Sequence, residues 1–162
     1  MSAQTVYKYS TPIGQPGGIV DIAPYAVDSF TNESNDGVVK PGMGVVRGTT
    51  AGVQAKAPAA GATAATFEGI VTNRRTYENT MTGGPEVKKG STLGVMRYGR
   101  IYGLVATEEA PAYGDAVYLV VSGNDAGCFA KTSTNNVAIK GRFLSAASDG
   151  IAIIELFNQA QS

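Results

Sequence analysis

The chain has 162 residues, and its 13 basic and 13 acidic side chains give a formal net charge of zero. A nucleic-acid-binding domain and a polybasic membrane anchor both need a basic surface, so the charge balance argues against each. The length suits one domain. Only 16% of the residues are charged, and a surface poor in charge favours packing against other subunits over a free monomer.

Glycine, tyrosine and β-branched residues set the expected secondary structure. The chain has 21 glycines and 8 tyrosines, a mixture typical of short strands joined by tight turns. The apolar run Val117–Val121 has only the length of a strand, far short of a bilayer span. The first residues lack the apolar core of a signal peptide, so we expect synthesis in the cytoplasm and no membrane partner.

Residues 1–18 are predicted to form an extended N-terminal arm. The segment is polar, and its prolines and glycines disfavour a regular element. It also carries apolar and aromatic side chains, which favour an arm that orders on a partner over the simpler alternative of a frayed terminus. Residues 19–162 would then form a single β-rich domain. The arm residues expected to contact the partner are Tyr7, Tyr9, Pro12 and Ile13.

The rest of the chain alternates apolar runs with turn sequences. Residues 23–37 are predicted to be irregular, and the alanine-rich residues 55–65 to be a surface loop. The pair Tyr98-Gly99 separates two runs and indicates a hairpin or a bend. This spacing predicts an all-β fold, either an antiparallel β-barrel or a jelly-roll-like sandwich. The predicted strands cover residues 18–22, 38–39, 45–47, 67–72, 92–97, 100–105, 116–121, 128–130, 137–144 and 151–156.

One weak internal similarity links two of these strands. Lys40–Arg47 and Lys89–Arg97 both begin with a turn of lysine and glycine. Both then continue into an apolar strand that closes on arginine. A shared way of turning into a strand explains this similarity better than a true duplication does.

The residue types needed for most enzymes and metal sites are missing. The chain has no histidine, and Cys128 is its only cysteine, so no catalytic triad, zinc site or internal disulfide can be built. Residues 32–37 begin like a calcium loop, but Met43 occupies the position of the bidentate glutamate. We predict no enzymatic activity, no cofactor and no metal, and only a pair of converging carboxylates would argue otherwise.

Arginine and tyrosine are the residue types that indicate a contact surface. Arginine forms bidentate pairs with carboxylates, and both residue types are enriched in protein interfaces. For any single position, a solvated arginine or a core tyrosine is the simpler alternative. The candidate interface residues outside the arm are Arg74, Arg75, Tyr77, Arg97, Tyr98 and Arg100.

Several separated segments, none with a catalytic motif, together point to a known family. They are Tyr9–Gly14, Ile19–Asp21, Phe67–Arg75, Gly94–Ile101, Tyr113–Leu119, Gly141–Leu144 and Glu155–Gln159. Across nearly the whole chain, these segments resemble the phage structural cement (head decoration) protein family. The resemblance implies a β-rich protein that binds the outside of an expanded icosahedral head and clamps neighbouring capsomers.

The resemblance also implies partners and a location. The partners would be the major capsid protein and further copies of this chain, with a trimer favoured over a dimer, and the location would be the exterior of the virion. Two other functions stay open. One is another virion component, such as a minor head or tail protein. The other is a carbohydrate-binding β-sandwich, whose aromatic platform would use tyrosine and phenylalanine because the chain has no tryptophan.

Overall fold

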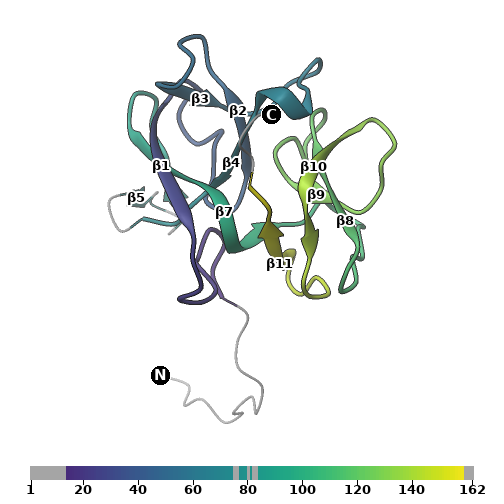
Figure 1. Ribbon diagram of the computed structural model, residues 1–162. Helices are drawn as coiled ribbons and strands as arrows, with labels where there is room; N and C mark the ends of the chain where they lie inside the picture. Colours follow the sequence, from purple (N-terminus) through teal and green to yellow (C-terminus); the bar gives the residue numbers. More distant parts are fainter. Residues whose placement is uncertain (1–13, 75–76, 80, 82–83, 159–162) are drawn as a thin grey trace.

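The computed structural model describes residues 14–74, 77–79, 81 and 84–158. Figure 1 shows two lobes of strands, with the long strand β7 (Thr92–Leu104) between them. The other elements are β1 (Ala26–Asn32), β2 (Gly44–Arg47), β3 (Gln54–Lys56), the 3-10 helix η1 (Ala64–Thr66), β4 (Phe67–Val71), β5 (Glu78–Asn79), β6 (Pro85–Glu86), β8 (Ala116–Val120), β9 (Phe129–Ala130), β10 (Asn136–Phe143) and β11 (Ile151–Leu156). The predicted all-β class is confirmed. No helix of the described residues is long and apolar enough to cross a membrane.

Each lobe is a sheet that closes on itself. In the first ring the strands pair in the order β1–β3–β2–β4–β7, and β7 then pairs with β1 again. In the second ring the order is β7–β11–β10–β8–β9. A parallel bridge from Phe129 in β9 to Val105, the residue after β7, completes this second circle. The fold is therefore a pair of small β-barrels that share one strand, which agrees with the barrel form of the sequence prediction.

The wall between the two rings is buried on both faces. Neighbouring side chains of a strand point to opposite faces, so in this wall one of them enters the core of the first ring and the next enters the core of the second. The pairs are Val45 and Val46 in β2, Val71 and Ile70 in β4, and Val95 and Met96 in β7. Because both faces are covered, these strands have continuous apolar runs instead of alternating ones.

Strand β7 differs from the sequence prediction. The sequence predicts two strands with a hairpin or a bend at Tyr98-Gly99, but one strand of 13 residues runs through this pair, so the hairpin is wrong. Gly99 has a φ of 123°, and a Cβ there would lie 2.6 Å from the Cβ of Tyr25. Glycine therefore lets β7 leave the first ring and continue into the second, where it pairs with β11.

Two strands lie where the sequence predicts irregular structure. Strand β1 falls within residues 23–37, and it is mostly polar, with Phe30 and Asn32 as its buried residues. Backbone pairing with β7 and β3 holds it. Strand β3 overlaps the predicted loop at residues 55–65. Conversely, the strands predicted at residues 18–22 and 38–39 do not form, since Ile19 makes only an isolated bridge and Val39 is buried outside any strand.

Residues 14–18, the described part of the predicted arm, are bonded to the domain. The N–H of Gly17 donates to the carbonyl of Tyr102 at 2.7 Å, and the N–H of Asn73 donates to the carbonyl of Gly17 at 2.8 Å. Gly17 has a φ of +74°, and a Cβ there would lie 2.6 Å from the Asn73 nitrogen. Residues 1–13 lie outside the described part, so the arm and its boundary at residue 18 stay predictions.

Candidate functional site

A pocket of about 710 Å³ lies where the two rings meet. Its walls come from residues 15–16 before β1, the segment before β2, the segment after β4, the β5–β6 pair and the end of β7. We call it the junction pocket. Its apolar walls include Pro16, Pro41, Pro85 and Leu104, and its polar groups are Gln15, Lys40, Asn73, Arg74, Tyr77 and Asn79.

Backbone hydrogen bonds fix the base of the junction pocket. The N–H of Gly42 donates to the carbonyl of Val71 at 2.8 Å, and the N–H of Leu104 donates to the carbonyl of Gly42 at 2.9 Å. Gly42 has a φ of +84°, and a Cβ there would lie 3.0 Å from the Cβ of Pro16. Only glycine allows these segments to approach so closely. The pocket is therefore built into the fold by three bonded segments.

Two of the predicted interface residues, Arg74 and Tyr77, line the junction pocket together. The hydroxyl of Tyr77 donates to the carbonyl of Thr72 at 3.2 Å. Burial raises the pKa of Tyr77, and the charge of the Arg74 guanidinium partly opposes this effect. A Cβ at Gly94 would lie 2.5 Å from the Nε of Arg74. The guanidinium thus lies over β7, in space that a side chain at position 94 would occupy.

Lys40 and Arg74 give the junction pocket two positive charges, and none of its lining residues is acidic. Within the described part of the chain, neither side chain forms an ion pair. The other described arginines all bind a carboxylate of this chain: Arg47, Arg97, Arg100 and Arg142. The pocket can therefore accept a negatively charged group from another molecule.

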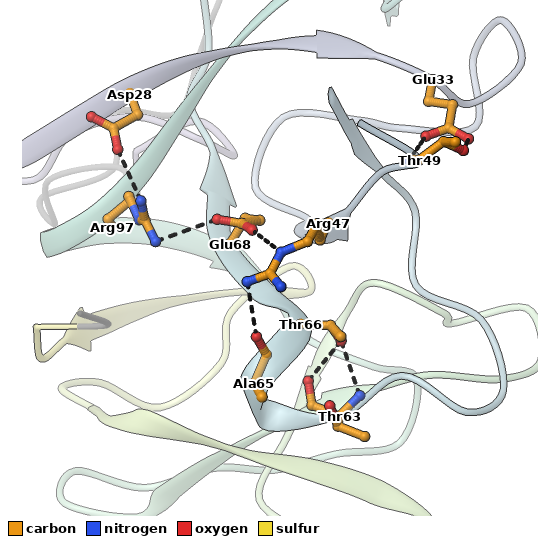
Figure 2. A network of polar contacts seen from close by, with 9 residues as sticks. All are labelled: Asp28, Glu33, Arg47, Thr49, Thr63, Ala65, Thr66, Glu68 and Arg97. Carbon is orange, nitrogen blue, oxygen red and sulfur yellow. Dashed lines mark hydrogen bonds and ion pairs between the residues drawn. The ribbon is translucent and has the colours of Figure 1, made fainter. Parts of the chain in front are cut away.

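Arg97, a third predicted residue, belongs to a network on the first ring (Figure 2). Its guanidinium binds Asp28 at 3.2 Å and the buried carboxylate of Glu68 at 3.3 Å. Arg47 binds the same carboxylate at 3.1 Å and donates to the carbonyl of Ala65 at 3.3 Å. Glu68 is 4% exposed, so its charge needs this pairing. Arg97 therefore has a structural role, whether or not a partner also contacts it.

Arg100 belongs to a second network at the start of the second ring. It binds Asp21 at 2.9 Å and Glu155 at 3.2 Å. Arg142 binds Glu155 at 2.7 Å and lies over the ring of Tyr113, 6.0 Å from its centroid. The hydrogen bonds from Arg142 and then Arg100 lower the pKa of Glu155, against the opposing effect of burial. This network connects residues 19–25 to β7, β10 and β11.

Tyr98 lies on an exposed apolar region beside β7. It is 43% exposed, and its backbone pairs with Ala26 at the start of β1. The segment that precedes β1 runs along β7 and carries further exposed apolar side chains, namely Ile19, Ile22 and Tyr25.

Five predicted contact residues lie outside the described residues: Tyr7, Tyr9, Pro12, Ile13 and Arg75.

The sequence prediction missed the carboxylates that bind the arginines. It also missed Lys40, the second cation of the junction pocket. One signal was available, because Arg47 and Arg97 close the two similar segments and both bind Glu68. No pattern places Asp21 or Glu155 beside Arg100, because they lie 79 and 55 residues away in the chain.

The structure offers little for catalysis by cysteine or by a metal. No group of three or more potential metal ligands occurs in the residues that the structure describes. Cys128 is a free thiol, and burial, together with Asp125, raises its pKa to about 11. At neutral pH the thiol is therefore protonated and a poor nucleophile.

Comparisons with known proteins found a matching family and a similar fold. A family model described as structural cement protein (E217 gp24/Pam3 gp6) matches residues 3–157. No curated protein matches the chain. A chain in the capsid of Myoviridae phage XM1 has a similar fold, with a TM-score of 0.75 and 18% identity, over 99% of this chain and 100% of that chain.

Proposed function

The chain belongs to the phage structural cement protein family, and from that premise we propose that it binds the outer surface of the expanded icosahedral head and holds neighbouring capsomers together. The family match, which spans residues 3–157, carries this proposal. It also favours the capsid over a tail protein and over a carbohydrate-binding sandwich. The partner is then the major capsid protein, and the chain is made in the host cytoplasm before it joins the virion.

The architecture supports a role as a rigid clamp. Two closed rings share β7, and the wall between them packs against one core on each of its faces. A closed sheet leaves no long free edge and resists deformation. Such a body can transmit load between two capsomers without rearranging. In the described residues there is no cluster of metal ligands, and the Cys128 thiol is protonated at neutral pH, which fits a protein that works through contacts.

The contact surface would combine several weak sites. We propose that the arm residues Tyr7, Tyr9, Pro12 and Ile13 order on a neighbouring subunit. An extended arm could add to a sheet edge of that subunit, where backbone hydrogen bonds supply the affinity. On the domain, the proposed contact residues are Arg74, Arg75, Tyr77, Arg97, Tyr98 and Arg100.

We propose a trimer over a dimer as the assembled form. Linked copies bind a symmetric surface with an avidity that exceeds the affinity of each copy. A ligand that binds only the intact expanded shell stabilises that shell by mass action. The low fraction of charged residues, 16% of the chain, suits a protein that buries much of its surface in this way.

The test is the thermal stability of undecorated expanded heads. Heads that are saturated with the purified protein should release their DNA or disassemble at a higher temperature than bare heads. A matched control adds the same amount of heat-unfolded protein. An unchanged disassembly temperature, with the protein bound, would show that the protein decorates the head without cementing it.

A further inference from the structure

Arg74 differs from every other described arginine of this chain. Each of the others binds at least one carboxylate of its own chain, whereas Arg74 has no acidic partner within the described residues. Arg74 is a half-buried residue, and its guanidinium lies over Gly94, beside Tyr77 and in the wall of the junction pocket. A partly desolvated arginine without an acid is best satisfied by an anion from another molecule.

We propose that the junction pocket binds an aspartate or glutamate side chain presented by an extended segment of the shell protein. This inference rests on the proposed function and names the chemistry of one contact in it. Arg74 would form the bidentate pair that its planar fork favours with a carboxylate. Lys40, which is exposed at the same pocket, would supply the second positive charge.

The shape and lining of the pocket suit a polypeptide. Pro16, Pro41, Pro85 and Leu104 provide apolar walls for the backbone and the aliphatic part of an acidic residue. The side-chain amide of Asn79 can bond to peptide groups, and so can the amide oxygen of Asn73, whose nitrogen donates to Gln15. A volume of about 710 Å³ is enough for a few residues. A nucleic acid fits poorly, because the chain has no net charge and the described lining of the pocket carries two cations.

The charge of the pocket also argues against the arm of this chain as its occupant. Residues 1–13 contain one lysine and no acidic residue, and residues 159–162 contain no acidic side chain. Within the described residues, five of the thirteen acidic side chains already form ion pairs, namely Asp21, Asp28, Glu68, Glu78 and Glu155. The carboxylate is therefore best supplied by a different chain.

Charge reversal tests the role of the pocket. Arg74→Glu and Lys40→Glu should each weaken saturable binding to undecorated heads by about tenfold or more. Lys131→Glu is the matched control, because Lys131 is exposed and lies outside the pocket; it should bind like the wild type. Lys40 is exposed, so Lys40→Glu leaves the fold intact even if Arg74→Glu destabilises it. Added salt should weaken the wild type more than Lys40→Glu.

Carbodiimide cross-linking identifies the occupant directly. The reagent activates a carboxylate, the Nζ of Lys40 attacks it, and an amide forms as the reagent leaves as its urea. On decorated heads, mass spectrometry should find Lys40 joined to an acidic residue of the shell protein. Lys40→Arg keeps the charge and should remove this link.

The outcomes separate this inference from the proposed function. If wild-type protein does not bind heads, the proposed function fails. If wild-type protein binds and both charge reversals bind equally well, only the assignment of the pocket fails. A Lys40 link solely to acidic residues of this chain would overturn the proposal in favour of a second copy as the occupant.

Discussion

The Nη2 of Arg97 lies 3.3 Å from the Oε2 of Glu68, and both residues are the extra residues of β-bulges. Ala26 pairs with Tyr98 and Val27 with Met96, which leaves Arg97 unpaired. Likewise, β2 pairs with the residues on either side of Glu68 in β4. A bulge re-aims a side chain out of the normal alternation. The two bulges thus direct opposite charges towards each other at the wall that the two rings share.

Removing the charge of Glu68 should destabilise the whole domain. Glu68→Gln leaves Arg47 without its acidic partner, and we expect a loss of about 1–3 kcal/mol in the free energy of unfolding. Urea unfolding followed by circular dichroism measures this loss. Glu78→Gln is the control, since Glu78 is 68% exposed in a surface pair with Lys88 and should change stability by less than about 1 kcal/mol. Equal effects would contradict a structural role for the network.

Gly69 should be intolerant of any side chain. It has a φ of +146°, and a Cβ there would collide with the carbonyl oxygen of Met96. Gly69→Ala should cost about 3 kcal/mol or more, or prevent folding. Gly52 also has a positive φ, +76°, but nothing lies within 4 Å of a Cβ there. Gly52→Ala should therefore cost only about 1 kcal/mol, and the difference between the two melting temperatures measures the steric contact together with the greater backbone strain at Gly69.

The stability contributed by Glu155 should depend on pH. Arg142 and Arg100 hold the folded pKa of Glu155 below its ordinary value of 4.5. The contribution is therefore complete above pH 4.5 and is lost as the pH falls through the lower folded value. Urea unfolding of the wild type and of Glu155→Gln from pH 6 to pH 3 tests this. Their stability difference should shrink towards acid, and a constant difference would contradict the assignment.

The three strands of the shared wall could be predicted because they contain buried apolar runs. Val45-Val46, Ile70-Val71 and Val95-Met96 were recognisable because both faces of the shared wall are apolar. Strand β1 was missed for the opposite reason, since tertiary backbone pairing holds a polar sequence. The uninterrupted course of β7 through Tyr98-Gly99 also depends on its neighbours, because this pair on its own favours a turn.

Part of the candidate site could be predicted from the sequence, and part depends on long-range contacts. Arg74 and Tyr77 were named from residue type and lie in one pocket. Lys40 joins them only through the backbone bonds that bring Gly42 next to Val71 and Leu104. That meeting of three segments is a long-range property of the fold, and short patterns do not carry it.

Removing the arm should separate folding from binding. Deletion of residues 1–13 should leave the melting temperature nearly unchanged but weaken binding to heads. The deletion stops at residue 13 because Gly17 and Gly18 exchange hydrogen bonds with Tyr102. A companion variant, Tyr7→Ser with Tyr9→Ser, keeps the arm and removes its aromatic side chains. If both variants bind heads as tightly as the full chain, the arm has no role in the contact.

The central claim is that this protein binds the expanded head at defined symmetric positions. Co-sedimentation of the purified protein with undecorated expanded heads, measured as copies bound per capsomer, tests it most directly. We predict saturable binding at a stoichiometry that matches one symmetry class of sites, with three copies per site for a trimer. Failure of correctly folded protein to sediment with the heads would contradict the claim.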